Sequence, residues 1–96
     1  ERSLGAYHVS KVFLSCKGVH LERGISESNE LQARIKEHMI SIADQVILLA
    51  DYSKFGIRAF THVADLSEVD VIITDQGVPQ DILDQLIERN ITVITA

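Results

Sequence analysis

The hydrophobic residues of the chain form short runs separated by polar turns, and these runs predict a set of strands. Residues 45–50 (QVILLA) and 69–74 (VDVIIT) are mostly apolar, which is typical of strands buried on both faces of a parallel sheet. Residues 11–16 (KVFLSC) are rich in strand-forming types, and residues 91–95 form a similar run near the end. We predict a further short edge strand at residues 59–63.

Between the runs at 11–16 and 45–50, apolar residues recur at helical spacing, which predicts a helix over residues 29–43. Asn29 is a suitable N-cap, and Glu30 lies in the first turn, where the helix dipole favours an acid. The apolar face of this helix is expected to consist of Leu31, Ile35, Met39 and Ile42. We interpret residues 17–28, which include two glycines, as a polar loop before the helix.

A second helix is predicted over residues 79–89, because Pro79 suits the first helical position and Asn90 suits a left-handed cap. Its apolar stripe would consist of Ile82, Leu83, Leu86 and Ile87. Residues 1–9 show no clear pattern, and we interpret them as the tail of a helix. The alternation of strands and helices indicates one α/β domain with a mainly parallel sheet and flanking helices.

Charge and composition restrict what this domain of 96 residues binds. The net charge of −5 argues against nucleic-acid binding by this segment, because such binding depends on basic surface. Residues 1–58 contain eight Lys and Arg against seven Asp and Glu, whereas residues 59–96 contain Arg89 against seven acids. No apolar run reaches the ~18 residues of a membrane span, and no secretory signal is present. We therefore expect a cytoplasmic protein without membrane contact.

Polar turns that contain glycine follow three of the predicted strands. In open α/β sheets, ligands bind at the carboxyl ends of the strands. The candidate ligand contacts in these turns are Gly18, His20, Asp51, Ser53, Lys54 and Asp75. Lysine and serine donate to phosphate oxygens and aspartate accepts from hydroxyls, which suits a phosphorylated polyol. Alternatively, the turns are polar only because strand-end turns usually are.

Other constellations point less directly to chemistry. Residues 23–26 (RGIS) precede the first helix, whose N-terminus favours an anion. Glu27 and Glu30 would repel an anion there, so we expect a solvated loop. Cys16 is interpreted as a buried structural thiol, and the four histidines show no metal-ligand spacing. We assign no catalytic residue, no metal and no cofactor.

Four motifs in order along residues 10–96 resemble those of one known family. ILLADYSKFG (47–56) is similar to a signature in which a buried strand runs into an Asp-x-Ser-Lys-Phe-Gly turn. FLSCKGVHLERGISESNE (13–30) resembles that family's strand, glycine turn and loop before a helix. ARIKEHMISIAD (33–44) resembles its Ala-x-x-Lys-x-x-Met helix, and VDVIITD (69–75) resembles its strand ending in Ile-Thr-Asp. The family is that of the DeoR-type bacterial transcription regulators.

The resemblance implies a sensor domain similar in fold to sugar-phosphate isomerases and CoA-transferase-like proteins. A phosphorylated sugar would bind it and change the affinity of an N-terminal winged helix for operator DNA. Most such regulators are oligomeric repressors of sugar-catabolic operons. The winged helix and a glycine-rich phosphate loop would lie upstream of residue 1. Residues 1–96 would then be the C-terminal portion of an N-terminally truncated sensor. The ligand contacts implied here are Gly18, His20, Asp51, Ser53, Lys54 and Asp75.

A sugar-phosphate isomerase-like enzyme fragment is the main alternative, with Asp51 or Asp75 as general base and Lys54 as electrostatic stabiliser. Such isomerases have an acid-rich turn where this chain has CKGVH, residues 16–20. A receiver domain phosphorylated on Asp51 is a second alternative, but receivers have an acidic pair after their first strand. We therefore predict a sensor rather than an enzyme.

Overall fold

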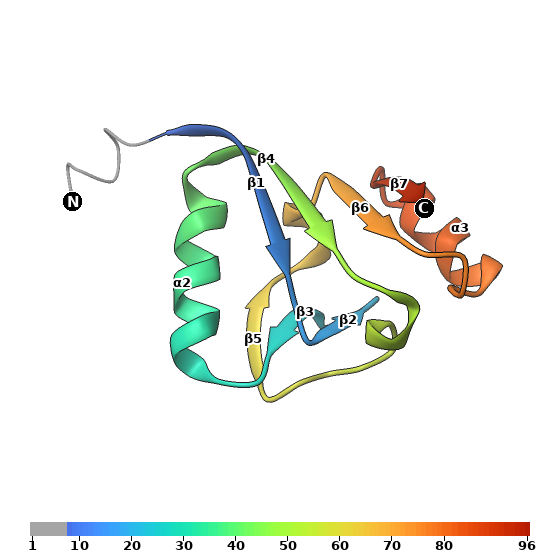
Figure 1. The fold of residues 1–96 in the computed structure, drawn as a ribbon, viewed down its shortest axis with the longest axis horizontal. Helices are drawn as coiled ribbons and strands as arrows, with labels where there is room; N and C mark the ends of the chain where they lie inside the picture. The colour runs from blue at the N-terminus through green and yellow to red at the C-terminus, as the bar shows by residue number, and fades with distance from the viewer. Residues whose placement is uncertain (1–7) are drawn as a thin grey trace.

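The computed structural model describes residues 8–96, which form two sheets and two helices (Figure 1). The helix tail expected over residues 1–9 falls largely outside the described residues, and Val9 already belongs to the first strand. The described part has the α/β architecture that the alternation of patterns predicted, with four parallel strands in the larger sheet.

The larger sheet has the strand order β1-β4-β6-β7, and all its pairings are parallel. Its strands are β1 (Val9–Ser15), β4 (Ala43–Leu49), β6 (Val71–Thr74) and β7 (Thr92–Thr95). Leu48 of β4 lies opposite Ile72 of β6, and both side chains are fully buried. The predicted parallel pairing of 45–50 with 69–74 is therefore confirmed.

The smaller sheet is antiparallel and corrects the prediction that residues 17–28 form a polar loop. Its order is β2 (Gly18–His20), β3 (Gly24–Glu27) and β5 (Thr61–Ala64). Val19 and Ile25 face each other in this sheet and are both 1% exposed. The strands are too short for a clear alternating pattern, and their glycines obscured the strand signal. The edge strand expected near residues 59–63 is confirmed as β5.

The first described helix, α2 (Glu30–Ser41), begins as predicted, but only part of its predicted apolar face points inward: Met39 packs against the core and Ile42 is half-buried. Asn29 Oδ1 accepts a hydrogen bond of 2.8 Å from the Gln32 N–H, which is the expected cap. Leu31 and Ile35 of the predicted stripe are 69% and 45% exposed. The buried residues are Ala33 and Ile40 instead. The small side chain of Ala33 lets the helix approach the sheets closely, and Lys36 on the same face is held inside by an ion pair with Glu27.

The second helix, α3 (Gln80–Glu88), has its termini where the sequence predicted them, within a residue. Pro79 is the N-cap residue, and Asn90 has a φ of 66°, the left-handed conformation expected after the helix. Leu86 is fully buried, whereas Ile87 of the predicted stripe is exposed. The helix therefore contacts the sheet along a narrower line than its apolar residues suggested.

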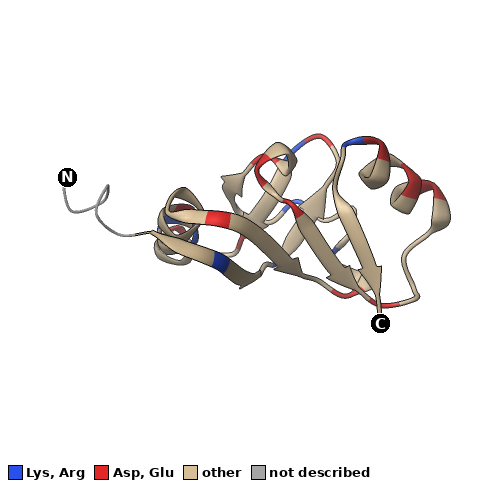
Figure 2. Cartoon of the chain, turned by 90° about the horizontal axis from the view of Figure 1, so that it is seen from above, with Lys and Arg blue, Asp and Glu red and all other residues tan. Residues whose placement is uncertain are grey.

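The two faces of the parallel sheet differ. In Figure 2 the helices and the smaller sheet lie on one side of it, and the other side is uncovered. On the covered side, Val12, Leu14 and Val46 join a single hydrophobic core with α2, α3 and the smaller sheet. On the uncovered side, Phe13 and Ile94 are exposed. The core thus holds the parallel sheet against the smaller sheet. The candidate sites lie at the carboxyl ends of the parallel strands and on the smaller sheet beside them.

Candidate functional site

The turn after β4 is held in shape by its own aspartate. Asp51 caps a short 3-10 helix, η1 (Tyr52–Lys54), and its Oδ1 accepts hydrogen bonds from the backbone N–H of Ser53, at 2.8 Å, and from the Ser53 hydroxyl. These two bonds, the hydroxyl bond foremost, hold the pKa of the exposed Asp51 carboxyl below its ordinary value. The Asp51 carboxylate therefore stays charged and fixed in orientation.

A second aspartate joins the turn after β6 to the turn after β4. Asp75 Oδ1 accepts hydrogen bonds from the Tyr52 N–H at 3.2 Å and from the Gly77 N–H at 3.1 Å. A Cβ at Gly77 would lie 2.6 Å from the ring of Tyr52, so only glycine allows this close approach. The structure thus brings Asp51, Ser53 and Asp75 to one edge of the sheet, where the sequence predicted them.

The smaller sheet meets this edge through β2. Val19 forms a parallel bridge with Phe55, and the Gly56 N–H donates to the Val19 carbonyl at 2.8 Å. The bridge places β2 beside the segment that follows Lys54. Gly18 and His20, the other two predicted contacts, flank Val19 in this strand.

Gly18 and His20 have structural roles that the sequence did not predict. A Cβ at Gly18 would lie 2.4 Å from the carbonyl oxygen of Ile57, so this glycine allows close packing of the chain. His20 Nδ1 accepts hydrogen bonds of 3.2 Å from the N–H groups of Glu22 and Arg23, which closes the hairpin turn. These contacts leave the opposite ring nitrogen of His20 for other partners.

A hollow of about 290 Å³ lies between β2, the Phe55 segment and α3. Its lining includes His20, Phe55 and Gly56 from the predicted site region and Gln85 and Arg89 from the helix. Only His20 among the six predicted contacts borders it. The exposed Asp51 and Ser53 instead form part of an open surface rather than a cavity.

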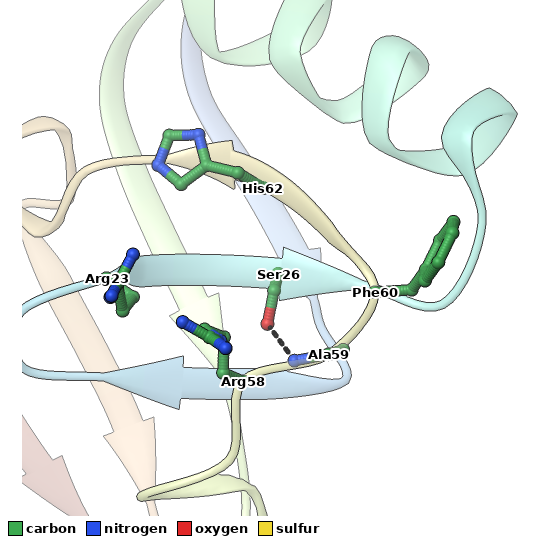
Figure 3. A pocket seen from close by; sticks show the side chains of 6 residues that line it. All are labelled: Arg23, Ser26, Arg58, Ala59, Phe60 and His62. Carbon is green, nitrogen blue, oxygen red and sulfur yellow. Dashed lines mark hydrogen bonds between the residues drawn. The ribbon is translucent and has the colours of Figure 1, made fainter.

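A larger hollow, of about 620 Å³, lies elsewhere, and we refer to it as the basic pocket (Figure 3). Its lining residues are Arg23, Ser26, Arg58, Ala59, Phe60 and His62. They come from the hairpin turn, β3, β5 and the segment before β5. Arg23 and Ser26 belong to the RGIS loop that the sequence marked as a possible anion site. No sequence pattern joins Arg58 and His62 to them, because only the antiparallel pairing of β3 with β5 brings these distant segments together.

A buried ion pair lies on the other side of β3. Lys36 Nζ contacts the Glu27 carboxylate and donates a hydrogen bond of 2.6 Å to the Ser15 carbonyl, at the end of β1. The two side chains are 13% and 4% exposed. Cys16 is buried nearby, and burial raises the pKa of its thiol to about 11. A thiol with this pKa is neutral at pH 7, in agreement with the structural role predicted for Cys16.

Within residues 8–96, no group of three or more His, Cys, Asp or Glu side chains is placed to hold a metal ion. Neither of the two described helices has the length and apolarity needed to cross a membrane. The polar groups at the carboxyl edge are two carboxylates, the Ser53 hydroxyl and the Lys54 ammonium, which between them can accept and donate hydrogen bonds.

Comparison with known proteins shows that the chain is similar to transcription regulators. A family model described as the DeoR C terminal sensor domain matches residues 1–76. The uncharacterized HTH-type transcriptional regulator YulB of Bacillus subtilis (strain 168) is 48% identical over 93 residues, which cover 97% of this chain and 36% of that protein. A putative aga operon transcriptional repressor of Escherichia coli O157:H7 is 37% identical, covering 98% of this chain and 35% of that protein.

The HTH-type transcriptional repressor GlcR of Bacillus subtilis (strain 168) is 40% identical over 87 residues, which cover 91% of this chain and 33% of GlcR. The chain thus spans about a third of the length of the curated relatives it matches. These relatives are named as regulators of transcription, which supports the sensor over the enzyme fragment considered from the sequence. The chain belongs to the DeoR C-terminal sensor domain family.

Proposed function

We propose that this domain is the part of a transcriptional repressor of a sugar operon that binds a phosphorylated sugar or polyol as effector. The family match supports the sensing role, and two of the relatives are named as repressors. The proposed ligand contacts are the turns at the carboxyl edge, with Lys54 and Ser53 toward the phosphate and Asp51 and Asp75 toward the hydroxyls. The Ser53 hydroxyl donates to Asp51 in this structure, so it would donate to the phosphate only after leaving Asp51. Gly18 and His20 border this region from β2.

The observation that supports this site most directly is the hydrogen bonding of its aspartates. Asp75 fixes the turn after β6 to the turn after β4 through the Tyr52 N–H, and Asp51 fixes the shape of its own turn through the Ser53 N–H. Each carboxylate still has a second oxygen with free acceptor capacity. A site whose groups are held before the ligand arrives loses less entropy on binding than a mobile one.

Signalling would follow from differential binding. An effector that binds one conformation of the regulator better than another shifts the population toward it, and the coupling to operator affinity is typically about 1–3 kcal/mol. Operator DNA would be bound by an N-terminal winged helix rather than by this acidic domain. We further propose that the regulator is cytoplasmic and homo-oligomeric; light scattering after gel filtration tests the oligomeric state.

A thermal-shift screen against phosphorylated sugars and their unphosphorylated parents tests the effector proposal. At 100 times the dissociation constant, a ligand stabilises the folded state by about 2.7 kcal/mol. We expect a shift from a sugar phosphate that is lost in Lys54→Ala and retained in Lys11→Ala, which removes an exposed lysine from β1. An equal shift in both variants would contradict the assignment of Lys54.

A further inference from the structure

The basic pocket collects positive charge in a protein that is negative overall. Arg23 and Arg58 both line it, although 34 intervening residues separate them in the sequence. In the part of the chain that the structure describes, neither guanidinium lies within 4.0 Å of a carboxylate oxygen. The acidic surplus of the chain lies elsewhere, for instance on α3 (Figure 2). Two uncompensated guanidinium groups in one hollow attract an anion.

Ser26 adds a buried donor to this hollow. Its side chain lies on β3 at the centre of the view in Figure 3, and the residue is only 4% exposed. Ser26 Oγ accepts a hydrogen bond of 2.8 Å from the Ala59 N–H. A hydroxyl also has one proton to donate, and no described residue accepts it. The hydroxyl proton of Ser26 is therefore available to a bound group.

His62 and Phe60 complete the wall. His62 lies opposite Ser26 in the β3–β5 pairing, and its Nε2 is 3.1 Å from a carboxylate oxygen of Asp65. Asp65 adds a carboxylate on that side of the hollow, whereas the arginines on the other side have no carboxylate partner among the described residues. Phe60 is 87% exposed and lies across Ser26 from Arg23 in Figure 3. It offers an aromatic surface to an uncharged part of a ligand.

We propose that the basic pocket binds the phosphate group of a small phosphate monoester, with Arg23 and Arg58 on the phosphate oxygens and Ser26 as a further donor. Arginine matches tetrahedral oxyanions through paired N–H groups. The volume of about 620 Å³ is that of a small-molecule site. This site is distinct from the turns at the carboxyl edge, and its assignment does not depend on an effector binding there.

Binding is tested by NMR titration of the 96-residue chain with inorganic phosphate, a hexose phosphate and the unphosphorylated hexose. The backbone amide of Ala59 reports on the pocket, because its N–H donates to Ser26 Oγ. We expect both phosphates to shift the Ala59 signal and the free hexose to leave it unchanged. Tighter binding of the hexose phosphate would identify a phosphorylated metabolite, rather than free phosphate, as the ligand.

Three variants make the test specific. Arg23→Gln and Arg58→Gln each remove charge-assisted hydrogen bonds, so we expect at least about tenfold weaker phosphate binding in each. Lys11→Gln is the control, because it removes one positive charge from an exposed residue of β1 that lines neither hollow, and it should bind phosphate as the native chain does. Equal weakening in all three variants would show a general charge effect and overturn the proposal, as would an Ala59 signal that does not respond.

The same titrations separate this proposal from that for the carboxyl edge. Suppose that Arg58→Gln loses phosphate binding and that Lys54→Ala binds the sugar phosphate as the native chain does. This result would support the basic pocket and would exclude Lys54 from the effector site. The reverse pattern would leave the edge as the effector site and refute the basic pocket.

Discussion

The two polar regions of this domain are built in opposite ways. At the carboxyl edge of the parallel sheet, Asp51 accepts from a backbone N–H of its own turn, and Asp75 accepts from a backbone N–H of the neighbouring turn. In the basic pocket, Arg23 and Arg58 have no carboxylate partner among the described residues. The carboxylates of the edge have donors within the fold, whereas the guanidinium groups of the pocket have no carboxylate acceptor among the described residues.

This difference shows which region depends on a ligand for its charge balance. The edge carboxylates have their hydrogen-bond donors within the fold, so their geometry needs no bound group. The arginines of the pocket repel each other unless water, salt or an anion lies between them. A bound phosphate would therefore stabilise the pocket more than the edge.

The largest effect is expected from Lys36, whose ion pair with Glu27 fixes β3 to the end of β1. Lys36→Ala leaves the Glu27 carboxylate buried without a partner, which should lower the free energy of unfolding by about 3–5 kcal/mol. Urea denaturation followed by circular dichroism measures this. Ser26 lies on the face of β3 opposite to Glu27. Lys36→Ala should therefore disturb the basic pocket more than the carboxyl edge.

Replacing both partners of the ion pair is the control for this prediction. Glu27→Leu combined with Lys36→Met removes both charges, and such replacements are often neutral or stabilising. The double variant should therefore regain most of the stability that Lys36→Ala loses. A double variant as unstable as the single one would mean that packing of the lysine stem, rather than its charge, holds β3 in place.

A smaller effect is expected where β3 passes β5 at Gly24. This glycine has a φ of 79°, and a Cβ there would lie 2.2 Å from the Ala64 carbonyl oxygen. Gly56 has a similar φ of 82° with no atom within 4 Å of the added Cβ. Gly56→Ala should cost about 1–2 kcal/mol for the left-handed backbone alone. Gly24→Ala should cost a further 1–3 kcal/mol or so for the clash.

The difference between these two unfolding free energies measures how tightly the β3–β5 wall of the basic pocket is packed. Equal losses in the two variants would show that β5 moves away from β3 at little cost. The pocket would then be adaptable rather than preformed, and the expected phosphate affinity would fall.

The sequence predicted the edge better than the pocket for a physical reason. Asp51 and Asp75 each follow a long apolar strand, and parallel strands place their carboxyl ends at one edge without further information. Arg58 and His62 meet Arg23 only because β5 pairs with β3, and that pairing follows no local pattern. Two short strands that begin with glycine, β2 and β3, appeared in the sequence as a loop.

The prediction of which face of α2 points inward was partly wrong for a related reason. Leu31 and Ile35 form the more hydrophobic stripe, yet Ala33 and Lys36 face the sheets. Hydrophobic periodicity assumes that a charged residue stays in water, and the Glu27 carboxylate on β3 removes that constraint for Lys36. A buried partner on another strand is a tertiary contact that no helical pattern contains.

The smallest effect concerns the charge of the edge itself. The hydroxyl of Ser53 is the main cause of the lowered Asp51 pKa, so Ser53→Ala should raise that pKa toward the ordinary value of about 3.9. A lowered folded-state pKa gives stability that is present above the unfolded-state pKa and lost as the pH falls through the folded one. Ser53→Ala should therefore flatten the acid side of the stability profile.

Carboxyl ¹³C signals of Asp51 followed against pH measure this change, and Ser67→Ala is a matched control. Asp65 and Ser67 have the same spacing as Asp51 and Ser53 at the start of the 3-10 helix η2 (Leu66–Glu68), but Asp65 makes no side-chain cap there. Ser67→Ala should leave the Asp51 titration unchanged. If Ser53→Ala also leaves it unchanged, the Ser53 N–H alone fixes the carboxylate, and the edge owes its preorganisation to backbone rather than to the Asp-x-Ser sequence.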